Sequence, residues 1–148
     1  MAVMQTDYRR ASHTLAAGQI IDQQLASAIT RVLAEGETIA CGAAVFATAD
    51  DSVVTAMPSE RFNGITYRDR CIEPGHDDLF RSRAILPIAR DGVVAVPVEG
   101  SVSKGQAAYV TPGKAITAAS SGNFALEGAA FESSGTGVVQ LRLSRIGE

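Results

Sequence analysis

The chain has 148 residues, of which 46% are hydrophobic and 20% are charged, and its formal net charge is −3. These proportions exclude a disordered chain and predict one globular domain that buries about two thirds of its unfolded surface. The negative balance gives no general attraction to nucleic acid or to an anionic membrane. Eleven of the thirteen basic residues are arginines, a side chain favoured at protein interfaces.

Residues 1–20 are polar and small and show no periodicity, so we expect an extended N-terminal arm ahead of a β domain over residues 21–148. The arm lacks the apolar core of a signal peptide, and no apolar run approaches the roughly 20 residues that span a bilayer. We therefore expect no membrane partner. Cys41 and Cys71 are expected to be thiols in a reducing cytoplasm, with a disulfide as the minor alternative.

Residues 21–34 fit two kinds of element. Apolar residues between Ile21 and Val32 recur at helical spacing, which favours a short helix that ends before Gly36, with this glycine as its C-terminal cap. The alternation from Ala28 to Leu33 also suits a strand, so both assignments stay open.

The rest of the chain consists of short apolar runs bounded by Gly, Pro or Asp, a pattern typical of an all-β protein. We expect strands within 38–48, 53–56, 62–68, 123–131 and 138–143, and a long surface loop over 69–82. Gly42, inside the first of these runs, predicts a bulge or a close backbone approach. Pro112 and Gly113 fit a type II turn. The expected fold is therefore mainly β, a small barrel or jelly-roll-like sandwich with at most one short helix.

Asp91 and Gly92 separate two strongly apolar runs and predict a hairpin with a two-residue loop. Both faces of that hairpin would be apolar, so each face needs a cover. Either another sheet of the same domain or a neighbouring subunit could supply the second cover. One face would carry the following four side chains, our candidates for a subunit interface: Ile85, Val94, Val96 and Val98.

No group of residues predicts catalysis, a cofactor or a metal site. His76, Asp77 and Asp78 are consecutive, so their side chains diverge, and the spacing of a calcium loop is absent. Cys71 with His76 or His13 lacks any supporting nucleophile pattern. The arginines between residues 61 and 90 are interleaved with acidic residues, which argues against nucleic acid as a partner.

Several segments together resemble the small cement, or decoration, proteins of tailed-phage heads. The resemblance covers most of the chain, roughly from residue 18 to residue 143, and each segment is weakly specific alone. The segments are Gly18–Asp22, Arg31–Gly36, Ile39–Val45, Phe62–Asp69, Val96–Gly100, Gly105–Thr111 and Val139–Leu143. The chain departs from the pattern at Cys41, where we expect a bulky apolar residue.

The resemblance implies a non-enzymatic capsid protein, assembled in the bacterial host cytoplasm and bound as a homotrimer to the outside of the virion. Its partners would be the major capsid protein, where neighbouring subunits meet, and other copies of itself. The arm is our candidate for reaching over a capsid neighbour, through Tyr8, Arg9, Arg10, Ile20 and Ile21. The competing hypothesis is a free-standing β module that binds carbohydrate or another ligand, and an enzyme ranks third.

Overall fold

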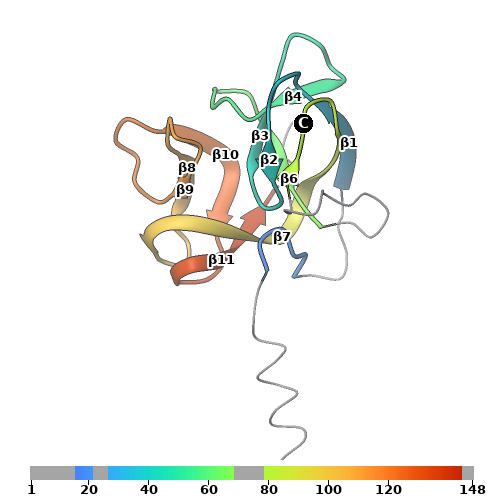
Figure 1. The fold of residues 1–148 in the computed structure, drawn as a ribbon. Coiled ribbons are helices and arrows are strands. Elements are labelled where there is room, and N and C mark those ends of the chain that lie inside the picture. The colour runs from blue at the N-terminus through green and yellow to red at the C-terminus, as the bar shows by residue number, and fades with distance from the viewer. Residues whose placement is uncertain (1–15, 22–26, 69–78, 145–148) are drawn as a thin grey trace, which may run out of the picture.

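The computed structural model describes residues 16–21, 27–68 and 79–144, and these form an all-β structure without a helix (Figure 1). The mainly β prediction is confirmed. The strands are β1 (Ser27–Leu33), β2 (Ile39–Ala40), β3 (Ala44–Ala47), β4 (Val53–Thr55), β5 (Phe62–Thr66), β6 (Leu79–Phe80), β7 (Ile85–Val102), β8 (Ala107–Val110), β9 (Ile116–Thr117), β10 (Phe124–Phe131) and β11 (Gly135–Leu143).

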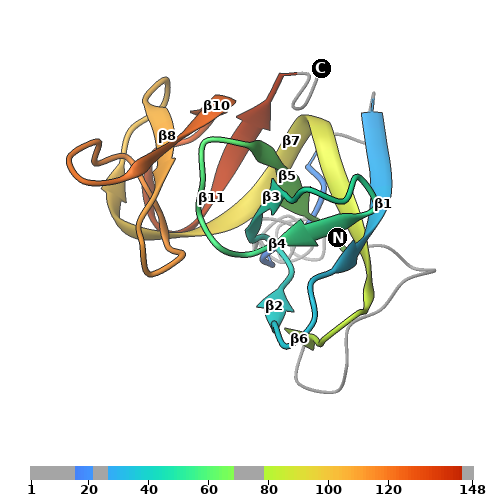
Figure 2. The ribbon, with the colours of Figure 1, turned by 90° about the horizontal axis from the view of Figure 1, so that it is seen from above.

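The strand β7 is shared by two closed rings of strands. The first ring runs β1–β4–β3–β5–β7 and closes where β7 pairs with β1, which makes a small five-stranded barrel. The second runs β7–β11–β10–β8–β9 and closes through one parallel pair, Val98 with Ile116. Figure 2 shows β7 crossing from one ring to the other, with β2 and β6 forming a separate small sheet. Closure of both rings leaves few unpaired strand edges.

Two apolar cores explain why so many strands are apolar on both faces. Leu33, Leu86 and Ile88 belong to the core of the first barrel, together with residues of β2, β3, β4 and β6. The other core combines residues of β3 and β5 with those of the second ring. Along β3 the two cores alternate, because Val45 enters the first and Phe46 the second. The second cover that the sequence requires is thus supplied by the same chain.

The predicted hairpin at Asp91 and Gly92 is wrong. β7 runs through both residues as one strand of 18 residues. Its first part pairs with β1 and β5, whereas its second part, from Gly92 onward, pairs with β11. Gly92 has a φ of 110°, a conformation that glycine adopts without strain. Long-range pairing on both sides of the strand therefore replaces the local turn.

The helix favoured for residues 21–34 is also wrong over the described part, because Ser27–Leu33 forms β1. This strand pairs with β7 along most of its length, and tertiary pairing outweighs the helical spacing.

Two local predictions are also wrong. Leu79 and Phe80 leave the expected surface loop to form β6, and in the turn after β8 the positive φ lies at Lys114 rather than at Gly113, so the turn is not type II.

Ala16–Ile21, which the sequence assigns to the arm and the start of the β domain, is bound to β7. Gly18 N–H donates to Ala95 O at 2.7 Å, and Ile20 forms an isolated bridge with Val94. Gly42 makes this docking possible, because a Cβ at that position would lie 2.9 Å from Gly18 N and 3.2 Å from Ala95 O. The close backbone approach predicted at Gly42 is confirmed.

Candidate functional site

The described residues contain no group of three or more His, Cys, Asp or Glu side chains that could hold a metal ion. His13, Cys71, His76 and the two aspartates after it lie outside the described residues, and Cys41 is only 2% exposed. Every aromatic side chain in the described ranges is buried or half-buried. No helix within those ranges is long and apolar enough to cross a membrane. The candidate sites that the described residues offer are surfaces that can contact a protein.

The four candidates for a subunit interface do not share one face. Val94 and Val96 are 0% exposed and belong to the chain's own core, so they offer no surface to another subunit, and their assignment is corrected. The sequence pattern misplaced them because β11 and the second ring cover this part of β7. Ile85 is 56% exposed, and Val98 is half-buried at the opposite end of the strand.

The five candidates for capsid contact divide between two regions. Tyr8, Arg9 and Arg10 lie outside the described residues. Ile20 packs against the second core, and Ile21 N–H donates to Val93 O at 3.0 Å. Within one subunit, these two residues therefore serve to hold the segment before β1 against β7.

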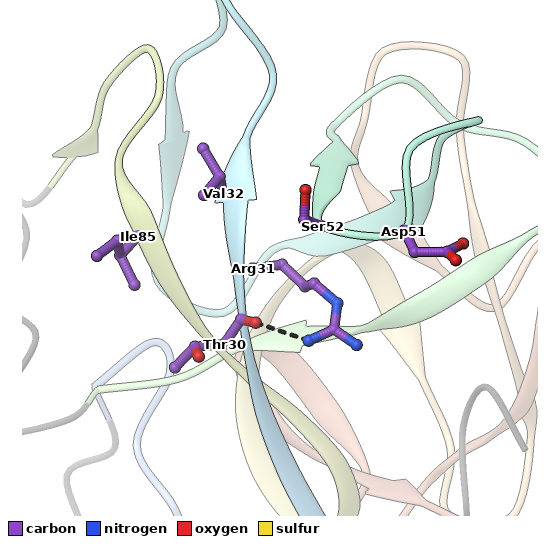
Figure 3. Close-up of a pocket in the computed structure, with 6 residues that line it drawn as sticks. All are labelled: Thr30, Arg31, Val32, Asp51, Ser52 and Ile85. Carbon is purple, nitrogen blue, oxygen red and sulfur yellow. Dashed lines mark hydrogen bonds between the residues drawn. The ribbon is translucent and has the colours of Figure 1, made fainter.

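Ile85 lies at the edge of a shallow hollow of about 370 Å³, lined by Thr30, Arg31, Val32, Asp51, Ser52 and Ile85 (Figure 3). Ile85 and Val32 are direct partners in the pairing of β7 with β1, so their side chains lie on the same face. In the same view, Arg31 and Asp51 lie on the other side of β1 from Ile85. An apolar floor beside one cation and one anion is the composition of a protein-contact surface.

The turn between β3 and β4 gives the hollow its shape. Asp50 Oδ1 accepts hydrogen bonds from Ser52 N–H at 2.9 Å and from Ser52 Oγ–H at 2.7 Å. Thr48 Oγ1–H donates to Val53 O at 2.8 Å and closes the turn from the other side. These bonds fold residues 50–52 into a tight turn beside β1, where Val32 N–H donates to Ser52 O at 2.9 Å, and the hollow lies next to this turn.

The two hydrogen bonds from Ser52, first from its backbone N–H and then from its hydroxyl, lower the pKa of Asp50 below the ordinary value. The carboxylate's contribution to stability is therefore complete above the unfolded-state pKa of about 3.9 and is lost as pH falls through the lower folded-state value.

We expect Ser52→Ala to raise the Asp50 pKa only in part, because the backbone donor remains. NMR titration of the Asp50 carboxyl measures this, with Ser121→Ala as the control. An unchanged Asp50 pKa in Ser52→Ala would contradict the role of the hydroxyl.

Val98 belongs to a second hollow of about 340 Å³, lined by Ala40, Cys41, Gly42, Ala43, Pro97, Val98, Glu99, Lys114, Ala115 and Ile116. Its floor is apolar, and Glu99 and Lys114 are exposed and carry opposite charges. Sequence reasoning identified one residue of each hollow, Ile85 and Val98, but missed Arg31, Asp51 and Lys114. Only the strand pairing brings those residues to the hollows.

A protein family described as "Structural cement protein (E217 gp24/Pam3 gp6)" matches residues 4–144 of this chain. The chain belongs to this family of phage cement proteins. One of the solved structures similar to the cement protein is a chain of "The capsid of Myoviridae Phage XM1", with a TM-score of 0.71 and 18% sequence identity. The alignment covers 89% of this chain and 91% of that one, so the two share a fold. No curated protein matches significantly.

Family membership makes the cement protein a structural component of phage capsids and places it in the virion, in a family that is not a class of enzymes. The resemblance predicted from seven short sequence segments is thereby confirmed at the level of the family.

Proposed function

We propose that the cement protein binds the outer surface of the phage head as a homotrimer and bridges adjacent subunits of the major capsid protein. The observation that carries this proposal is the match of the cement family over residues 4–144. Packaged DNA presses the shell outward, and a clamp across the seams between subunits resists their separation. Each contact can be weak, because three linked contacts in a trimer raise the effective concentration of each.

Two features of the surface support a role in protein contact. Ile85 is a large apolar side chain that is 56% exposed at the edge of its hollow. The hollow beside Val98 carries Glu99 and Lys114, so a second copy can offer each of them an opposite charge. We assign Val98 and this hollow to the trimer contact.

The N-terminal arm is proposed to strengthen the attachment to a capsid neighbour. Gly18 and Ile20 are bonded to β7, so removal of residues 1–15 leaves those contacts in place. Deletion of residues 1–15 is expected to leave the domain folded and to weaken binding to heads about tenfold or more. This test measures the contribution of residues 1–15, which include Tyr8, Arg9 and Arg10.

The experiment combines native mass measurement of the full chain with co-sedimentation on phage heads assembled without cement protein. The expected results are a trimer, saturable binding, and a higher temperature for DNA release from heads that carry the protein. The arm-deleted chain is the second sample, with circular dichroism as the control for folding. A monomeric protein that does not bind heads would contradict the proposal. Equal binding by the full chain and the arm-deleted chain would show that the arm does not contribute to the attachment.

A further inference from the structure

Among the residues that the structure describes, the outer edge of β1 has no strand partner before Val32. Leu33 N–H donates to Ala84 O at 2.9 Å, toward the β7 side, whereas Val32 N–H donates to Ser52 O at 2.9 Å on the opposite side. Backbone groups alternate in direction along a strand, so Thr30 directs its N–H and C=O to the same side as Val32. The register of β1 with β4 contains only the pairs Val32–Val53 and Leu33–Val54. Thr30 therefore lies on an open edge.

The backbone groups that could have extended this pairing to Thr30 form hydrogen bonds within the β3–β4 turn instead. A continued parallel ladder would offer Thr30 the carbonyl of Asp50 and the N–H of Ser52. Asp50 O instead accepts Val53 N–H at 3.1 Å, and Ser52 N–H donates to Asp50 Oδ1 at 2.9 Å. Within the described part of the chain, the Thr30 N–H has no acceptor. In the same part of the chain, the Thr30 carbonyl accepts one hydrogen bond, from the Arg31 guanidinium at 2.8 Å.

Beside this edge lies the hollow of about 370 Å³ with its exposed Ile85 and half-buried Val32 (Figure 3). A strand added along β1 would place alternate side chains on that face, and one apolar side chain would cover Ile85. Arg31 forms no ion pair with any described residue, so it offers a cation to an acidic side chain of the same segment. Backbone donor, apolar hollow and cation thus lie within a few residues of each other.

We propose that the outer edge of β1 binds an extended segment of the major capsid protein as an added β-strand. The Thr30 N–H donates to a carbonyl of that segment, an apolar side chain enters the hollow beside Ile85, and an acidic side chain pairs with Arg31. This inference rests on the proposed attachment to the capsid. Until the segment arrives, the bond from Arg31 to the Thr30 carbonyl protects the edge from unwanted strand pairing.

A second copy of the cement protein is a poorer occupant for this edge. In a two-fold contact through β1, one hollow would face the same hollow of its partner, and neither could fill the other. The Arg31 side chains of the two copies would also lie near each other, which opposes pairing. An extended segment with one apolar and one acidic side chain can fill the hollow and pair with Arg31.

The test uses the full chain, with heads assembled without cement protein as the probe. Thr30→Pro removes the outward N–H, and proline is tolerated at an edge position that faces away from the neighbouring strand. Thr30→Ala is the matched control, because it removes the side chain but keeps the N–H. We expect Thr30→Pro to bind heads at least tenfold more weakly than wild type and Thr30→Ala to bind within about twofold.

Ile85→Glu provides an independent variant in case Thr30→Pro does not fold. Ile85→Glu places a charge beside the hollow. The control, Met57→Glu, places a charge on a similarly exposed side chain that does not line the hollow. We expect at least tenfold weaker binding only for Ile85→Glu. Hydrogen exchange adds a direct readout, since the Thr30 amide should become protected when wild-type protein binds heads.

The outcomes separate this inference from the proposed function. Failure of wild type to bind heads contradicts the function itself. Normal binding by both Thr30→Pro and Ile85→Glu overturns strand addition and leaves the function intact. Dissociation of the trimer by Thr30→Pro, seen by native mass, would assign the edge to a second copy and also overturn the inference.

Discussion

Gly64→Ala is expected to lower the free energy of unfolding of the cement protein by about 4 kcal/mol, the sum of an unfavourable φ and a steric clash. Gly64 has a φ of +148°, and a Cβ there would lie 2.5 Å from both Ala89 O and Ile88 Cγ2. The carbonyl belongs to the backbone of β7, so it cannot move aside without breaking the β5–β7 pairing at Ile65 and Ala89. A small domain has only about 5–15 kcal/mol in total.

Gly36→Ala is the matched control for this substitution. Gly36 has a φ of +82°, but nothing lies within 4 Å of an added Cβ, so the variant pays only the conformational cost of about 1–2 kcal/mol. Urea denaturation followed by far-ultraviolet circular dichroism measures both variants. Similar losses in the two would show that the contact with β7 does not dominate at Gly64.

Phe46→Ala is expected to cost about 3–5 kcal/mol, the usual range for removal of a fully buried phenylalanine. Phe46 is 0% exposed, and its ring centroid lies 5.9 Å from that of Phe62. It extends from β3 of the first barrel into the core that also holds residues of the second ring, such as Leu141. We therefore expect Phe46→Ala to accelerate hydrogen exchange in β1 and β10 together, as one cooperative unit.

Leu33→Ala is the control, since Leu33 is equally buried but belongs to the core of the first barrel. Its expected cost is about 2–5 kcal/mol. If the two rings fold as one unit, both variants unfold in a single transition whichever strand is observed. Exchange that rises only in β10 for Phe46→Ala would contradict this cooperativity.

The strands that pair with close neighbours in sequence could be predicted from the chain alone. β4 and most of β10 and β11 lie where alternating or apolar runs are bounded by turn residues. Elements decided by distant partners could not be predicted. β1 is a strand because β7 pairs with it, and Asp91 and Gly92 continue β7 because β1 and β11 flank them.

Of the residues that line the hollow beside β1, the sequence identified only the apolar Ile85 as a candidate contact residue. Ile85 was identified as an interface residue because an apolar pattern on β7 extends to it. Thr30, Arg31 and Asp51 were not, because their importance arises where the β1–β4 pairing stops. The Asp50–Asp51–Ser52 sequence signals a turn, but not that this turn leaves a neighbouring strand edge open.

The shared strand β7 also affects how the molecule responds to force. A pull applied across the two rings is transmitted through the covalent backbone of Ile85–Val102 rather than through side-chain packing alone. Rupture then requires shearing β7 from β1, β5 and β11 at the same time, instead of opening a seam one hydrogen bond after another. Such a subunit should extend little under load before it fails.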